Sequence, residues 1–186
     1  MAHGIIIESK IAAKDIDVLN RSVVAEVDVD AGSLLALTPP SQVGSDVWTA
    51  EAPSADALEG LWMAYNPTNR ISKFEDLEFA GLSVDDRRYT NIANKTFDAF
   101  KPTKYDEVEF SQDCLADASA VANVVTGDFL ESAAGSFKLA RKAKAVGATA
   151  GHTAFEVEYV KKYTFPKTHG IGDVDYKFFR ARCVAE

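Results

Sequence analysis

The chain has 186 residues, of which 47% are hydrophobic and 26% are charged. This composition is typical of a globular protein, and the length predicts a single β-rich domain over residues 1–186. Lys and Arg together number 20 against 28 Asp and Glu, which gives a net charge of −8. Because nucleic acids and anionic membranes attract basic surfaces, this acidic balance predicts neither of them as a partner.

The first residues, MAHGIIIESK, begin an N-terminal arm that we place at residues 1–14. Their apolar run, Ile5 to Ile7, is too short for a signal peptide or a membrane-spanning helix. The two cysteines, Cys114 and Cys183, each have apolar neighbours. Two isolated cysteines favour a reducing compartment and buried, unreactive thiols over a disulfide.

Short segments with strand-like patterns follow one another along the chain, separated by turns. Residues 25–30 alternate apolar and acidic side chains, and residues 33–38 form an apolar run bounded by turn residues. Alternation with period two and short apolar runs both predict strands. The predicted strands cover residues 25–30, 33–38, 46–52, 61–67, 76–81 and 106–111. A loop covers residues 39–46, and residues 53–60 predict a loop or one helical turn.

The clearest pattern lies near the C-terminus, where residues 152–165 and 173–185 predict a long hairpin. In the first segment Phe155, Val157, Tyr159, Tyr163 and Phe165 share one face. In the second segment the apolar phase shifts after Phe178, which indicates a bulge or burial on both faces. Residues 113–135 mix alanine with β-branched residues and predict mixed structure. We therefore expect a mainly β fold, a sandwich or barrel with one or two short helices and a long C-terminal hairpin.

The segment GLSVDDRRYTNIANKTFDAFKP, residues 81–102, concentrates charged, aromatic and amide side chains. Ser83 and Asp86 match a helix-capping pattern, and Tyr89 and Ile92 have the spacing of one helical face. Phe97 and Phe100 predict contacts with a core. We interpret the segment as a capped turn or short helix that connects two strands.

No motif in the sequence indicates catalysis, a metal or a cofactor. The three histidines, His3, His152 and His169, lack any recognised metal-ligand spacing. The acidic run from Glu26 resembles the start of a calcium loop, but its twelfth position is Leu37 instead of an acid. The sequence therefore predicts a protein that is not an enzyme, with no catalytic residues, no cofactor and no metal.

Trp48, Trp62 and Tyr65 offer one alternative, because three aromatic rings can form a stacking platform for sugars. Their strand-like apolar surroundings favour the core instead. A carbohydrate-binding β-sandwich module, or a small hydrolase of that fold, thus stays open as a second hypothesis.

The run AGLSVDDRRYTNIANKTFDAFKPTKYDEVEFS, together with SLLALTPPS and LWMAYNPTNR, resembles the head decoration, or capsid cement, proteins of tailed bacteriophages. The resemblance implies a noncatalytic structural protein of the virion, bound to the capsid exterior after assembly in the host cytoplasm. Its implied partners are the major capsid protein and further copies of itself, for example in a trimer. Another virion component, from the tail or the head–tail connector, is the alternative within this class.

The capsid contact is expected through the N-terminal arm, residues 1–14, or through an exposed sheet edge. Within the segment 81–102, Arg87, Arg88 and Tyr89 are the predicted interface residues, because Arg and Tyr are enriched at protein interfaces.

Overall fold

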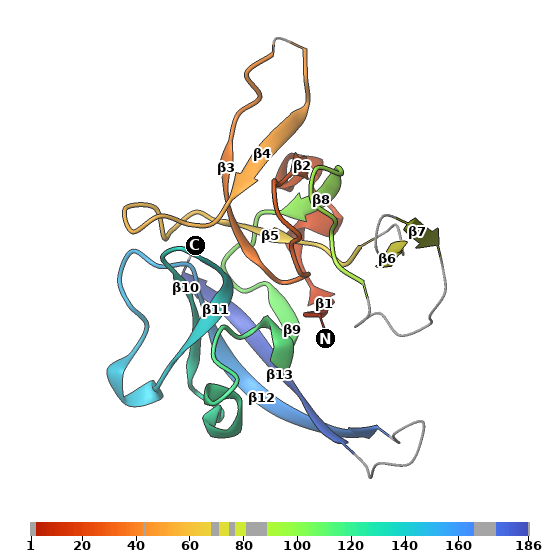
Figure 1. Cartoon of the computed structure of the whole chain (residues 1–186). Helices are drawn as coiled ribbons and strands as arrows, with labels where there is room; N and C mark the ends of the chain where they lie inside the picture. The colour runs from red at the N-terminus through yellow and green to blue at the C-terminus, as the bar shows by residue number, and fades with distance from the viewer. Residues whose placement is uncertain are drawn as a thin grey trace.

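The protein is mainly β, as the sequence predicts, and combines a six-stranded sheet, a closed five-stranded barrel and a small separate hairpin (Figure 1). The computed structural model describes residues 3–42, 44–67, 71–74, 77–80, 89–165 and 174–185. The sheet contains β1 (Ile6–Lys10), β9 (Glu107–Ser111), β10 (Phe129–Ala133), β11 (Ser136–Lys142), β12 (Ala154–Phe165) and β13 (Val174–Ala185). The barrel contains β2 (Asn20–Val24), β3 (Leu34–Thr38), β4 (Val47–Glu51), β5 (Trp62–Ala64) and β8 (Phe97–Phe100), and the small hairpin contains β6 (Ile71–Phe74) and β7 (Leu77–Ala80).

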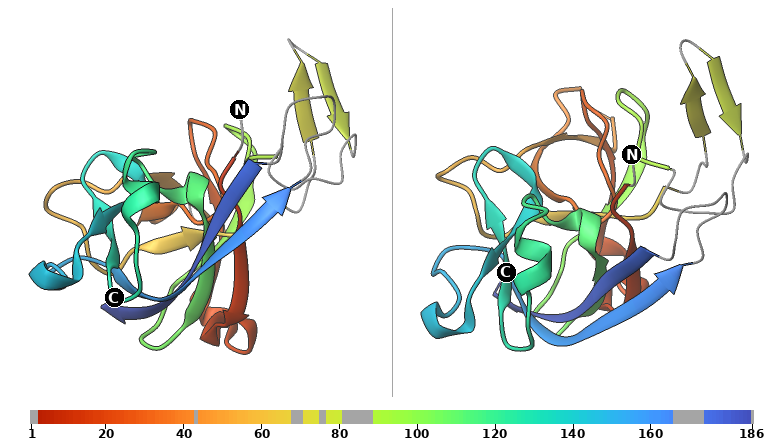
Figure 2. Two further views of the ribbon diagram at one scale, coloured as in Figure 1. Left: turned by 90° about the horizontal axis from the view of Figure 1, so that it is seen from below. Right: turned by 60° about the horizontal axis from the view of Figure 1, so that its bottom comes forward.

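The six-stranded sheet has the order β1-β9-β13-β12-β10-β11, and each neighbouring pair is antiparallel. The predicted C-terminal hairpin is confirmed, because β12 and β13 pair along their whole length. Only residues 178–182 of β13 also pair with β9, so the far end of the hairpin extends beyond the other strands, as both views of Figure 2 show.

The barrel closes in the order β2-β4-β3-β5-β8, with β2 parallel to β4 and the other pairs antiparallel. Register partners share a face, so the pairs Val23 with Phe97 and Ala64 with Ala99 face the barrel interior. That interior is a small apolar core whose other buried members are Ala25, Val29, Leu35 and Ala50. Its short side chains suit a narrow five-stranded barrel.

A second, larger core joins the barrel to the sheet. Leu34, Met63 and Phe100 point outward from the barrel and pack with residues of the sheet's inner face, such as Phe110 and Phe179. Gly32 lies at this junction with φ of +77°, and a Cβ there would come within 2.7 Å of the Ile6 side chain. Only glycine therefore allows the chain to turn into β3 so close to β1.

Helical structure in the described part of the chain is limited to short 3₁₀ turns. These are η1 (Ala12–Lys14), η2 (Asp17–Leu19), η4 (Gln112–Cys114), η5 (Ala120–Asn123) and η6 (Lys144–Val146). Two of them, with β10, make up the mixed structure predicted for residues 113–135. None of the described helices has the length and apolar character needed to cross a membrane.

The strand predicted at residues 25–30 is wrong. Val29 makes a single bridge to Asn91, and the Asp28 carboxylate accepts a hydrogen bond from the backbone N–H of Ala93 at 2.8 Å. Asn94 also donates its N–H to the carbonyl oxygen of Ala25. The segment is a loop fixed against another loop, in which Ala25 and Val29 are buried whereas Val27 is 51% exposed.

The face predicted for β12 is correct only over its first part. Phe155 and Val157 are buried, whereas Tyr159 is 56% exposed and Tyr163 is 42% exposed. The register shifts between Val157 and Tyr159, so Glu158 is an extra residue in β12. The side chains after it therefore point to the opposite face of the sheet from the one that the sequence pattern predicts.

The segment 81–102 is described only from Tyr89 onward, so the predicted Ser83–Asp86 cap lies outside the described residues. From residue 89 to 96 the chain forms a bridge and turns instead of a helix. Phe97 and Phe100 belong to β8 and are buried, which confirms their predicted contact with a core.

Residues 3–14, the described part of the expected N-terminal arm, belong to the body of the protein. Residues 6–10 form β1, which pairs with β9, and Ile6 and Ile11 are buried in the larger core. Apolar burial therefore fixes this segment as an edge strand and the turn after it.

Candidate functional site

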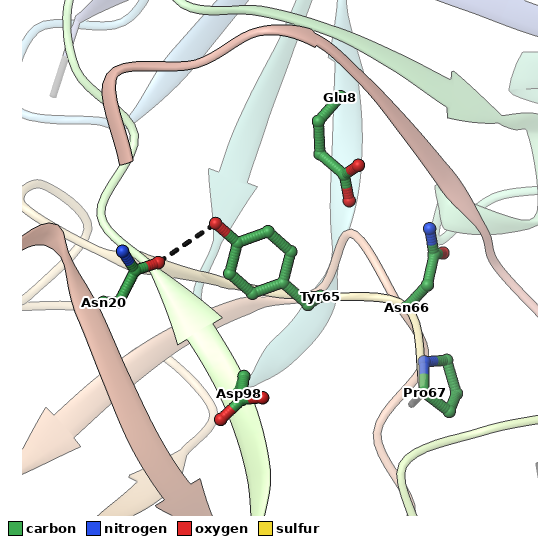
Figure 3. Close-up of a pocket in the computed structure, with 6 residues that line it drawn as sticks. All are labelled: Glu8, Asn20, Tyr65, Asn66, Pro67 and Asp98. Carbon is green, nitrogen blue, oxygen red and sulfur yellow. Dashed lines mark hydrogen bonds between the residues drawn. The ribbon is translucent and has the colours of Figure 1, made fainter. Parts of the chain in front are cut away.

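A pocket of about 520 Å³ opens where the edge of the sheet meets the barrel (Figure 3). Each neighbouring element contributes to its wall: Glu8 from β1, Asn20 from β2, Asp98 from β8, and Tyr65, Asn66 and Pro67 from the chain leaving β5. In the view of Figure 3 the Glu8 carboxylate lies above the Tyr65 ring and Asp98 below it, with Asn66 and Pro67 to the right.

Tyr65 is held in place through its hydroxyl group and through the contact of its ring with Phe100. Its hydroxyl donates a hydrogen bond to Asn20 Oδ1 at 3.0 Å, and its ring packs against Phe100 with centroids 4.6 Å apart. Burial, together with the nearby carboxylates of Glu8, Asp98 and Asp106, raises the Tyr65 pKa to about 12. The hydroxyl is therefore protonated at neutral pH and acts as a donor.

Asn66 closes the pocket by capping the outer edge of β1. Its Oδ1 accepts the N–H of Ile6 at 3.0 Å, and its Nδ2 donates to the carbonyl oxygen of Ile6 at 2.6 Å. The amide thus replaces a neighbouring strand. Lys14 makes a further contact on this edge by donating to the carbonyl oxygen of Glu8 at 2.8 Å. Side-chain caps of this kind protect an edge strand from pairing with another chain.

The three aromatic residues considered for sugar stacking do not form one platform. The guanidinium carbon of Arg21 lies 5.5 Å from the Trp48 ring centroid and 5.2 Å from that of Trp62. Arg21 also donates to the carbonyl oxygens of Val18 and Asn20. The two indoles therefore hold a cation at one end of the barrel interior. Tyr65 belongs to the other core, where it packs on Phe100.

A second surface of interest is the face of the six-stranded sheet that points away from the larger core. Here Ile7, Tyr159 and Tyr163 are exposed aromatic and aliphatic side chains, with exposed fractions of 47%, 56% and 42%. We call it the outer sheet face. Its residues are Ile7, Lys10, Glu107, Glu109, Glu156, Glu158, Tyr159, Lys161, Tyr163, Phe178, Arg180 and Arg182.

Ion pairs connect the strands across this face. Glu107 pairs with Arg180 and, at 3.0 Å, with Lys10, and hydrogen bonds from these two cations lower the Glu107 pKa. Glu109, which is 5% exposed, pairs with Lys161. Arg182 lies within 3.6 Å of Glu156 and 3.4 Å of Glu158. The long charged side chains are thus held in fixed positions along the sheet.

The predicted interface residues are only partly described. Arg87 and Arg88 lie outside the described residues. Tyr89 is 1% exposed, so its ring is part of the protein interior and is not offered to a partner at the surface.

The expected burial of Cys114 and Cys183 is confirmed, and the two cysteines do not form a disulfide, while their low reactivity stays a prediction. Burial raises the Cys114 pKa to about 12. In the described part of the chain, no group of three or more His, Cys, Asp or Glu residues is arranged to hold a metal ion.

Of the residues around the pocket, only Tyr65 was singled out from the sequence. Glu8, Asn20 and Asp98 come from strands far apart in the chain, so no local pattern joins them. The Asn-Pro pair at positions 66 and 67 was a signal, because it marked the end of a strand where the chain turns into the pocket.

Comparisons with family models, curated proteins and solved structures find no match for this chain. The resemblance to capsid decoration proteins thus stays a prediction from the sequence.

Proposed function

We propose that this protein is a noncatalytic binding protein that docks on a protein lattice through its outer sheet face, in the manner of a phage capsid decoration protein. The observation that carries the proposal is the composition of this face. Exposed Tyr159 lies opposite Arg180, and the exposed side chains of Tyr163 and Ile7 are on the same face of the sheet. Tyr and Arg are the residue types most enriched in the energetically important parts of protein interfaces.

The charge of the outer sheet face also supports docking on another protein. Its four cations, Lys10, Lys161, Arg180 and Arg182, face four acids, Glu107, Glu109, Glu156 and Glu158. The face is therefore neutral in a chain whose net charge is −8. A neutral face avoids the long-range repulsion that the rest of this acidic surface exerts on an acidic partner or a second copy.

The paired arrangement of these charges lowers the cost of binding. Side chains that are already ordered by ion pairs lose less conformational freedom when a partner covers them. The aromatic cluster at one end of the face is ordered in the same way, since the Phe178 ring lies 5.4 Å from both Tyr163 and Tyr176.

The edge of β1 is a poorer docking surface than the sheet face. Asn66 and Lys14 already bond the backbone groups of Ile6 and Glu8 that point outward. A strand added there would first have to displace both side chains, so the proposal places the contact on the face.

Cosedimentation with capsid shells that lack the protein tests this proposal. The wild-type protein should pellet with shells, and the double variant Tyr159→Ala/Tyr163→Ala should bind roughly tenfold more weakly per tyrosine removed if each is an interface anchor. The matched control is Val18→Ser/Val146→Ser, which alters two similarly exposed apolar residues away from the face. Failure of the wild type to pellet would overturn the capsid partner. Equal binding by both double variants would overturn the assignment of the face.

A further inference from the structure

We propose that the pocket between β1 and the barrel is a binding site for an organic cation, namely a guanidinium or primary ammonium group on an alkyl stem. The first reason is the set of hydrogen-bonding groups that the pocket can still offer to a ligand. The Tyr65 hydroxyl donates to Asn20 Oδ1, and the Asn20 amide donates to the carbonyl oxygen of Ala13. The Asn66 side chain bonds the backbone of Ile6 through both its oxygen and its nitrogen.

Two carboxylates that line the pocket are not used by these internal bonds. Glu8 and Asp98 have no Lys, Arg or His nitrogen within ion-pair distance among the residues that the structure describes. Ser22 donates to Asp98 Oδ1 at 3.4 Å, a long contact that leaves most of the acceptor capacity of this carboxylate unused. The Lys14 ammonium contacts the carbonyl oxygen of Glu8, not its side chain.

The two carboxylates are the charged groups that the pocket offers, and they favour a ligand donor with positive charge. A neutral sugar hydroxyl group needs donors as well as acceptors, and here the Tyr65 hydroxyl and the Asn20 amide already donate to protein oxygens, so one N–H of Asn66 stands against two carboxylates. The ligand class that fits is therefore a cation with several N–H groups.

The rest of the wall suits the carbon part of such a ligand. The Tyr65 ring offers a π-face, on which a cation gains electrostatic attraction, and Pro67 offers an apolar surface for an alkyl stem. The same carboxylates that raise the Tyr65 pKa act on the ligand in the opposite sense, because they stabilise its charged form.

Arg and Lys side chains of a partner protein carry this chemistry, and we assign the pocket to one of them. This assignment goes beyond the proposed docking function, because the pocket lies beside the barrel and shares no residue with the outer sheet face. The pocket itself is tested on the isolated protein, so failure of the capsid experiment leaves it standing.

The experiment is a titration with N-acetyl-arginine methyl ester, followed by the amide resonances of Tyr65 and Asn66. N-acetyl-citrulline methyl ester, which has a neutral urea group of nearly the same shape, is the control ligand. Saturable shifts are expected only with the arginine compound. Glu8→Gln and Asp98→Asn should each weaken binding by roughly threefold, the size expected for one partly exposed charge pair. Glu59→Gln, which removes an exposed acid outside the pocket, should leave binding unchanged.

Equal binding of the citrulline compound, or equal binding by the two pocket variants, would overturn the cation site. Titration with free L-arginine tests whether the natural ligand is a side chain of a partner protein or a small molecule. Its own carboxylate is repelled by Glu8 and Asp98, so it should bind no more tightly than the blocked ester if a partner's side chain is the natural ligand. Tighter binding of free arginine would overturn that source and indicate a small molecule instead.

Discussion

Asp128 provides the sharpest stability test, because one buried carboxylate connects three segments of the sheet region. The residue is 1% exposed. It accepts hydrogen bonds from Arg141 Nε at 2.7 Å, from the Lys144 N–H at 3.0 Å and from the Val125 N–H at 3.2 Å. Substitution Asp128→Asn keeps the shape but replaces one acceptor oxygen with a donor that faces other donors.

The expected loss follows from these contacts. With its oxygen in the Oδ2 position, Asn keeps the bonds from Arg141 and Val125 but turns its NH2 group toward the Lys144 N–H, and the Arg141 cation loses its charged partner. Arg141 keeps access to water because its side chain is 24% exposed, so we expect a loss of about 2–3 kcal/mol in the free energy of unfolding. Urea denaturation measures this value, and Asp56→Asn, at an exposed loop position, is the control.

The pH dependence adds an independent check. Burial alone would raise the Asp128 pKa, but hydrogen bonds from Lys144, Arg141 and Val125 lower it below its ordinary value of 3.8. A lowered folded-state pKa stabilises the protein fully above 3.8, and this stabilisation is lost as the pH falls through the folded-state value. The stability difference between wild type and Asp128→Asn should therefore be constant near neutral pH and shrink below 3.8. A difference smaller than about 0.5 kcal/mol at pH 7 would refute the reasoning.

Three further outcomes follow from contacts described above. Arg21→Met removes the cation from between the two indoles, so tryptophan fluorescence should change and the free energy of unfolding should fall by about 1–2 kcal/mol; an unchanged emission spectrum would contradict the stacked arrangement. Cys114 and Cys183 should be inert to a thiol reagent in the native protein and react fully after denaturation, and native labelling would contradict their burial. Asn66→Ala exposes the Ile6 edge, so hydrogen exchange at the Ile6 amide should accelerate and self-association should rise, as size-exclusion chromatography would show; no change in either would argue against the cap.

Much of the strand content followed from the sequence because the patterns were local. The apolar run at residues 33–38 and the long segments at 152–165 and 173–185 are bounded by turn residues, and each forms a strand. Their pairing was predictable only for the hairpin, where one loop joins the two strands. The parallel pairing of β2 with β4 depends on barrel closure, which no short window of sequence encodes.

The prediction of a strand was wrong where side chains and another loop, instead of a neighbouring strand, form hydrogen bonds with the backbone. Residues 25–30 alternate as a strand does, but the Asp28 carboxylate and the loop at residues 91–94 take the place of a ladder. In β12 a single extra residue, Glu158, reverses the face of Tyr159. The outer sheet face owes its exposed tyrosines to that bulge, so period-two counting could not have found it.

The place of β13 at the centre of the sheet constrains the order in which this protein folds. β13 lies between β9 and β12, yet it comes last in the chain among the six strands of this sheet. Until it emerges, neither β9 nor β1 can pair through it with the strands β12, β10 and β11. Contacts that link such distant parts of a chain form slowly, and a nascent sheet with open edges associates readily with other chains. Removal of the last strand is therefore expected to divide the sheet into two halves, instead of merely trimming one side of it.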